Sequence, residues 1–102
     1  MTRSHLCLRA KPGRRDELLR VLNRVEVRTA ASEQPGFLAA EIQLPFEDPD
    51  RVLVWSSWAS REHYERWRSS VGCEELLQEL NGLVAEEPES RVYHVVDAFE
   101  AV

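Results

Sequence analysis

Apolar side chains in this chain follow two different periods, and the order in which these periods alternate restricts the possible folds. Residues 4–11 alternate apolar and polar side chains with the two-residue period of a β-strand, and residues 37–45, 51–58 and 91–99 repeat the pattern. Turn residues at 47–50 separate the second and third of these segments. The sequence therefore predicts four strands, of which the middle two form a hairpin.

The segments between the predicted strands have apolar residues at helical spacing. Residues 14–32 repeat apolar side chains every three or four positions and predict one amphipathic helix. Ser60 is a good N-cap for a second helix, which Gly72 interrupts, and residues 73–81 predict a third. Gly82 is expected to end it in the left-handed conformation. The order strand, helix, two strands, helices, strand predicts an α+β ferredoxin-like βαββαβ fold with a four-stranded antiparallel sheet.

The sheet face that no helix covers is apolar, so it must be buried by something else. Leu53 and Trp55 alternate with Val52 and Val54 in the third strand, so both faces of that strand are apolar, and the fourth strand shows the same feature. No further helix is left in the chain to cover the second face. The simplest cover is the same face of a second copy, which predicts a two-fold homodimer of the dimeric α/β-barrel kind.

Length and charge restrict the class of protein. With 102 residues we expect a single domain, 1–102. The net charge of -5 argues against nucleic acid as a partner, because phosphate binding needs clustered basic side chains. No apolar run approaches the roughly 20 residues that span a bilayer, and no signal segment opens the chain, so we expect a cytoplasmic protein that does not bind membranes.

Cysteine and histidine show no pattern typical of a metal site or a disulfide. Cys7 and Cys73 are expected to be small buried hydrophobic residues, because nothing indicates a secretory context. The three histidines have no other ligand-type side chain at a spacing typical of metal binding, so no metal is predicted.

Aromatic residues gather in one segment, residues 55–70, which contains all three tryptophans. A strand that ends at Trp58 and a helix that begins after Ser60 would place Trp58, Tyr64 and Trp67 around the space between sheet and helix. Flat aromatic walls favour a flat apolar ligand, while the indole N–H and phenol O–H supply directional hydrogen bonds. We therefore expect the aromatic residues, Trp55 included, to line one cavity. The alternative is that they only fill the core.

In these residues and in the order of its elements, the chain resembles the antibiotic biosynthesis monooxygenase (ABM) domains of the dimeric α/β-barrel superfamily. The resemblance runs from residue 6 to residue 99. It is strongest in PGFL at 35–38, in RVLV at 51–54 and in the segment WASREHYERWRS at 58–69.

The resemblance implies a fold and an activity. One branch of this family oxidises polycyclic phenols, quinols or anthrones with O2 and uses no flavin, haem or metal. Trp58 and Tyr64 fall on matching aromatic positions of that branch. Its active-site Asn corresponds to Val54, and its helix Arg falls near Leu77 or Gln78, so two polar partners are replaced.

A second branch of the family degrades haem. Trp67 matches its cavity tryptophan, but its haem-ligating His corresponds to Leu77 and its strand-one Asn to Leu6. Without an iron ligand, haem degradation is disfavoured. The resemblance thus implies an enzyme without a cofactor, whose partners are an aromatic small molecule and O2.

The candidate site residues follow from this comparison and from side-chain chemistry. A phenolic substrate must lose a proton, and His is the side chain that titrates near neutrality, so His63 and His94 are candidate bases. Tyr64 or the Trp67 N–H could instead stabilise the oxyanion. The predicted catalytic residues are Trp67, Tyr64 and His63, and the predicted substrate-binding residues are Trp58, Trp55, His94 and Leu6.

Two other functions stay open at this point. Val54 and Leu77, at positions where the family has polar residues, also fit a non-catalytic dimeric module that binds a small molecule or assists another protein. An isomerase or cyclase of the same superfamily would use the same cavity without adding oxygen. For each histidine the alternative is a surface or interface residue.

Overall fold

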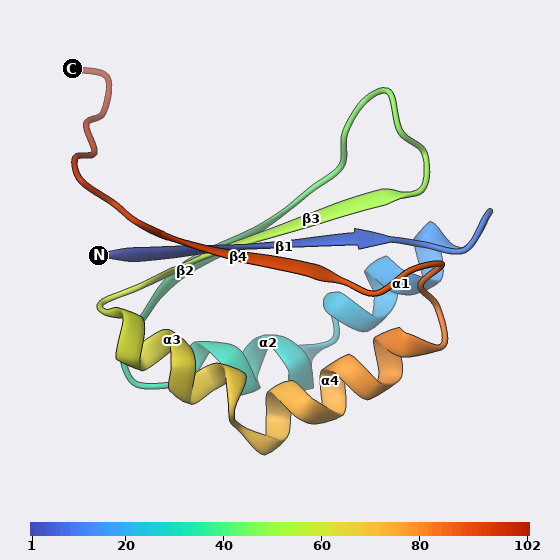
Figure 1. Ribbon diagram of the computed structural model, residues 1–102, viewed down its shortest axis with the longest axis horizontal. Helices are drawn as coiled ribbons and strands as arrows, with labels where there is room; N and C mark the ends of the chain where they lie inside the picture. Colours follow the sequence, from blue (N-terminus) through green and yellow to red (C-terminus); the bar gives the residue numbers. More distant parts are fainter.

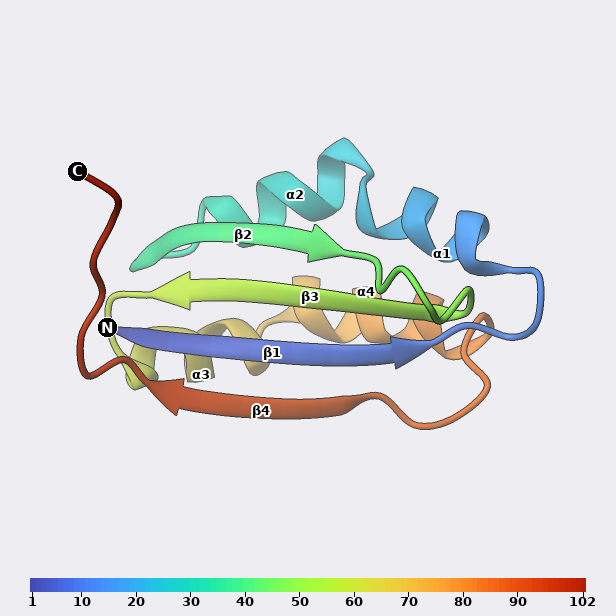
Figure 2. The same cartoon turned by 90° about the horizontal axis from the view of Figure 1, so that it is seen from above.

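All 102 residues are described by a computed structural model of the chain, whose sheet lies on one side and whose helices lie on the other (Figure 1). The elements in chain order are β1 (Thr2–Arg9), α1 (Arg15–Leu22), α2 (Val25–Ser32), β2 (Phe37–Gln43), β3 (Arg51–Trp58), α3 (Arg61–Arg68), α4 (Val71–Asn81) and β4 (Glu89–His94). The strands lie in the order β2-β3-β1-β4, and each neighbouring pair is antiparallel (Figure 2). This confirms the α+β ferredoxin-like fold and the hairpin of β2 and β3.

A leucine-rich core holds the sheet to α1 and α4. Leu8 and Val52 lie opposite each other in β1 and β3, and both are fully buried on the helix-covered face. Leu18 of α1 and Leu80 of α4 are fully buried against them. Burying each such side chain stabilises the fold by about 1.5–3 kcal/mol. The aromatic residues are not members of this cluster, so the helix-covered layer has two parts.

The prediction of one helix over 14–32 was wrong, because two helices cover this segment. Asn23 ends α1 with φ -93° and ψ 1°, and Arg24 is extended at the start of α2. Asn favours helix ends because its short amide competes for backbone hydrogen bonds. The break gives the two helices different surroundings: α1 buries Leu18 and Leu22, whereas α2 has no buried residue.

The predictions for the later helices also need correction. The chain breaks at Ser69 and Ser70 rather than at Gly72, because the Ser70 hydroxyl caps α4 by accepting from the Cys73 N–H at 3.2 Å. Gly82 follows α4 with φ -75°, so the predicted left-handed cap does not form. The predicted Ser60 N-cap is confirmed, since its hydroxyl accepts from the His63 N–H.

Strand β3 has the predicted bounds, whereas the other strands differ from prediction by a few residues at their ends. Strand β4 stops at His94, five residues earlier than expected. The register explains this difference, because His94 lies opposite Thr2 and β1 offers almost no further backbone to pair with. One hydrogen bond, from the Val95 N–H to the Met1 carbonyl at 2.9 Å, ends the pairing.

Gly36, at the turn into β2, is predicted to be essential for stability. Its φ is +80°, and a Cβ added there would overlap the His63 ring. Gly13 also has a positive φ, +76°, but a Cβ there would meet nothing within 4 Å. We expect Gly13→Ala to lower the free energy of unfolding by about 1–2 kcal/mol from backbone strain alone. Gly36→Ala should lower it by about 3 kcal/mol or more, since overpacking adds to strain.

Urea unfolding followed by circular dichroism measures both changes. A His63→Ala substitution in the Gly36→Ala background should recover part of the loss, because it removes the ring that the new methyl group would overlap. Equal losses for the two glycine variants would contradict the assigned contact.

Candidate functional site

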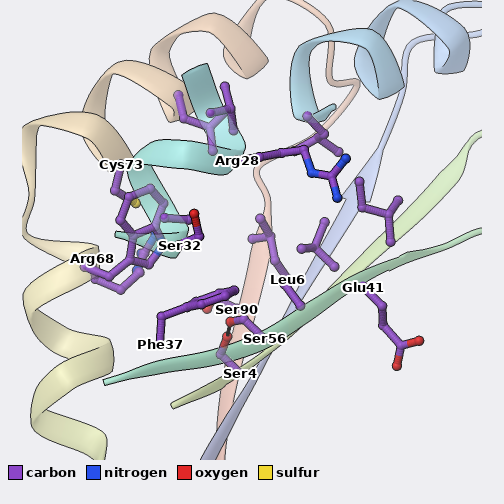
Figure 3. Close-up of a pocket in the computed structure, with 18 of the residues that line it drawn as sticks. Ser4, Leu6, Arg28, Ser32, Phe37, Glu41, Ser56, Arg68, Cys73 and Ser90 are labelled. Atoms are coloured by element: carbon purple, nitrogen blue, oxygen red, sulfur yellow. Dashed lines mark hydrogen bonds between the residues drawn. The ribbon is translucent and has the colours of Figure 1, made fainter. Parts of the chain in front are cut away.

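A pocket of about 670 Å³ lies between the sheet and the helices, beside the leucine core (Figure 3). Sixteen of its 24 lining residues are hydrophobic, so it favours an apolar ligand. Every helix contributes to the lining, together with the helix-facing side of the sheet. The predicted residues that line it are Leu6, Trp58, Tyr64 and Trp67.

The aromatic residues form one end of this pocket. Trp58 is fully buried, and its ring lies nearly parallel to that of Trp67, with 6.5 Å between centroids and 20° between planes. Tyr64 and Phe37 approach Trp58 edge-on at centroid distances of 6.2 and 5.3 Å. Edge-to-face and offset arrangements are the favourable geometries for aromatic pairs. The structure thus brings Trp58, Tyr64 and Trp67 together around Trp58, with Phe37 as an additional member.

Hydroxyl groups from three strands give the apolar pocket a polar floor. The Trp58 Nε1–H donates to Ser56 Oγ at 2.9 Å, and Ser56 is also hydrogen-bonded to Ser4. Tyr64 Oη and Ser90 Oγ are 3.0 Å apart.

Each of these two hydroxyl pairs has two protons and only one mutual hydrogen bond, so each keeps one O–H that can donate to a ligand. Figure 3 shows Ser4, Ser56 and Ser90 close to one another below Phe37.

Sequence reasoning missed these serines, although a signal for them existed. Ser4 and Ser56 are partners in the β1–β3 register and lie on the face that also carries Leu8 and Val52. A polar residue at a helix-facing position of a strand indicates a buried hydrogen bond or a site. Ser90 lies opposite Leu6, which places it on the same face.

The indole N–H of Trp67 makes no hydrogen bond within the chain, unlike those of Trp55 and Trp58. Trp67 lines the pocket on its helix side and is half-buried. An indole N–H is a donor only, so it can meet an oxygen atom of a ligand. Trp67 therefore adds a free donor to those of the two hydroxyl pairs.

Trp55 does not share this pocket, contrary to the expectation that the aromatic residues line one cavity. It is three residues from Trp58 in β3, and side chains an odd number of residues apart point to opposite faces of a sheet. On the free face its ring stacks on His5 with 4.1 Å between centroids, and its Nε1–H donates to Gln43 Oε1 at 2.7 Å.

His63 and His94, the two candidate bases, also lie outside the pocket lining. The His63 Nδ1 is 2.7 Å from Ser60 Oγ, and its ring packs against Gly36. His94 is exposed at the end of β4. Glu41 is the one acidic residue that lines the pocket, but its carboxylate points away and binds Arg3 at 3.1 Å. The pocket therefore presents no imidazole or carboxylate that could act as a base.

Comparison with known proteins gives the same family as the resemblance in residues 6–99. The model of the family described as antibiotic biosynthesis monooxygenase matches residues 1–79, more than half of the chain. The chain belongs to the antibiotic biosynthesis monooxygenase family. No curated protein sequence matches this ABM domain.

Solved structures share the fold of this ABM domain over nearly its whole length. A Deinococcus radiodurans protein superposes with a TM-score of 0.85 at 19% identity, covering 100% of this chain and 99% of its own. SnoaB from Streptomyces nogalater, a cofactor-independent oxygenase, gives 0.83 at 12% identity, covering 98% of this chain and 97% of its own. A Mycobacterium tuberculosis protein gives 0.82 at 12% identity, covering 97% and 98%. At these identities the likeness shows the fold.

The ABM domain has neither a side-chain cluster of the metal-binding kind nor a helix of the membrane-spanning kind. No three His, Cys, Asp or Glu side chains gather in a group that could hold a metal ion. None of the helices combines the length and the apolar composition needed to cross a membrane.

Cys73 lies in the pocket wall and is predicted to be unreactive. Burial raises the pKa of its thiol above the ordinary value, and the nearby Arg68 guanidinium opposes this shift only in part. A raised pKa means less thiolate at any given pH, and the thiolate is the nucleophile. In a Cys7→Ser variant, iodoacetamide at pH 8 should therefore modify Cys73 markedly more slowly in the folded protein than in urea.

Mass spectrometry of timed samples measures the two alkylation rates. As the pH rises, the unfolded protein should become reactive first and the folded protein later, because the folded thiol has the higher pKa. Equal rates in the two states at pH 8 would contradict the buried placement of Cys73.

Proposed function

We propose that this ABM domain is a cofactor-independent monooxygenase that oxidises a polycyclic aromatic phenol, quinol or anthrone with O2. The observation that carries the proposal is the pocket itself: a mostly apolar space with parallel indole rings at one end and free hydrogen-bond donors on its floor. SnoaB, which shares the fold, is a cofactor-independent oxygenase.

In the proposed reaction the substrate supplies the electrons. The ionised phenol or enol passes one electron to O2, and the two radicals combine to form a carbon–oxygen bond. Protonation gives a hydroperoxide, which loses water and leaves a new carbonyl group. One oxygen atom of O2 stays in the product and the other leaves as water.

The protein's part in this reaction is positioning and stabilisation of charge. The half-buried Trp67 presents its ring for stacking on the planar substrate, the fully buried Trp58 holds Trp67 in place from behind, and Leu6 packs against the same space. The free Trp67 N–H and the hydroxyl pair of Tyr64 and Ser90 donate hydrogen bonds to the substrate oxyanion. These residues are the proposed catalytic and substrate-binding groups. His63, His94 and Trp55 lie outside the pocket, and we propose no role for them in the reaction.

One observation favours a second candidate function. The pocket has no imidazole or inward carboxylate, so a non-catalytic module that only binds the same kind of ligand is the alternative. An isomerase or cyclase is disfavoured by the same observation, because those reactions move protons through an acid or base.

Oxygen uptake with an anthrone or quinol tests the proposed reaction. We expect multiple turnovers, with one atom of 18O2 appearing in the product. Trp67→Phe and Tyr64→Phe should each lower kcat by about tenfold or more, because each removes one donor to the developing oxyanion.

Tyr93→Phe is the matched control for Tyr64→Phe, since these are the two tyrosines of the chain and Tyr93 lies on the other sheet face, near Trp55. Its kcat should equal that of the unchanged protein. Tight binding of the anthrone without product would support the binding module and contradict the monooxygenase. Product without added oxygen would point to the isomerase or cyclase.

We further propose that the free sheet face is covered by a second copy of the chain. The face carries Trp55 stacked on His5, with Leu53 and Tyr93 beside them. A facing copy would cover these apolar side chains with the same face of its own sheet.

Sedimentation equilibrium tests this proposal. We expect a dimer at micromolar concentration, and Leu53→Glu should shift it toward monomer, because the substitution puts one charge from each copy into the covered face. Gln78→Glu, on an exposed position of α4, adds the same charge away from the interface and should leave the dimer intact. A monomer at high concentration would refute this proposal.

A further inference from the structure

We propose that the pocket takes its aromatic ligand as an anion, paired with Arg28 of α2 and Arg68 of α3. This inference rests on the proposed function and adds a substrate class to it: aromatics whose phenol, enol or carboxyl group is ionised at the working pH. The observation behind it is a local excess of positive charge at a pocket in an acidic protein.

Both arginines line the pocket, and neither forms an ion pair. Seven of the twelve arginines of the chain are paired with carboxylates. Arg28 and Arg68 are exposed as well as pocket-lining, which places them at its rim. Figure 3 shows the guanidinium of Arg28 extending from α2 toward the side of the pocket where Leu6 lies.

The other charged and titratable groups of the lining do not cancel these two charges. The Glu41 carboxylate is turned to the opposite face and is paired with Arg3. Cys73 stays a neutral thiol, because burial raises its pKa. The Tyr64 hydroxyl is hydrogen-bonded to that of Ser90. Glu74 and Glu87 line a second, polar cleft together with Arg68, but neither carboxylate forms an ion pair with it, and Arg28 is not part of that cleft.

The uncharged polar groups of the pocket favour an anion too. The Trp67 N–H and the spare protons of the two hydroxyl pairs are all donors. Donors directed at a charged oxygen stabilise the ionised form of a ligand and lower its pKa, as a nearby cation does. The net charge of -5 acts in the opposite direction, but exposed charges farther away than about 10 Å are screened at ordinary salt.

This arrangement explains how a pocket without a base could support oxidation. A substrate that arrives already ionised needs no proton acceptor from the protein. The pH dependence of turnover would then follow the pKa of the bound substrate and not that of a histidine.

Titration of a coloured phenol in the pocket tests the proposal without any turnover. Quinizarin, 1,4-dihydroxyanthraquinone, is planar and changes colour when it ionises, so absorbance reports its protonation state when free and when bound. We expect binding to lower its pKa by about one unit, which corresponds to about tenfold tighter binding of the anion than of the neutral form.

Arg28→Gln and Arg68→Gln should each reduce this pKa shift and together abolish most of it. Arg66→Gln is the matched control, because Arg66 is an exposed, unpaired arginine of α3 that does not line the pocket. It removes the same unit of charge two residues from Arg68 and should leave the shift unchanged. These are exposed side chains without ion pairs, so the variants should fold normally.

Three outcomes would overturn the inference: a bound pKa equal to or above the free one, no binding of the dye, or an effect of Arg66→Gln as large as that of the other two. The last would mean that overall charge, not the pocket, sets the shift. Because the titration is run without O2, it is independent of catalysis. A lowered pKa with no oxygen uptake by any anthrone would support the anion site and refute the monooxygenase.

Discussion

The buried indole of Trp58 determines the arrangement of the aromatic half of the molecule. It ends β3 on the helix-covered face and is fully buried. Three aromatic rings contact it, and its N–H holds Ser56 in the hydroxyl network. A large rigid side chain with a satisfied polar atom has few alternative positions. The orientation of Trp67 and Tyr64, and therefore the shape of the pocket, depends on this one residue.

The chemistry of the pocket follows from what surrounds this indole. Donors and cations are present, whereas bases are turned outward or lie elsewhere. Such a site can bind, orient and stabilise negative charge, but it cannot take a proton from a weak acid. Reactivity must then come from the ligand, and this requirement links the proposed oxidation to the inferred preference for an anionic aromatic.

Much of the fold could be predicted from the sequence, because hydrophobic periods report which face of an element is buried. Strand β3 and the Ser60 cap came out as expected, since the turn residues at 47–50 and the cap at Ser60 lie directly on either side of the strand in the sequence. Bounds that depend on partners did not: β4 ends where β1 has no further backbone to pair with. The helix break at Asn23 was also missed, although Asn is a residue type that favours helix ends.

The site was predictable only in part, for a related reason. Trp58, Tyr64 and Trp67 were identified because they are close together in the sequence. Ser4 and Ser90 come from distant strands, and only the sheet register brings them to the pocket. Trp55 shows the opposite error, because nearness in sequence suggested a shared cavity that strand alternation forbids. Arg28 and Arg68 carry no motif, and their importance depends on the absence of carboxylate partners.

The two parts of the helix-covered layer explain how so small a chain can keep an open pocket. Leu8, Leu18, Val52 and Leu80 form a tightly buried core at α1 and α4. Helix α2 buries no residue, and the pocket lies between it and the sheet. A cavity costs stability because its walls lose packing partners, and a domain of this size has only about 5–15 kcal/mol in total. The leucine core supplies that stability away from the site, so the wall formed by α2 is free to remain loosely packed and to carry Arg28 at the rim.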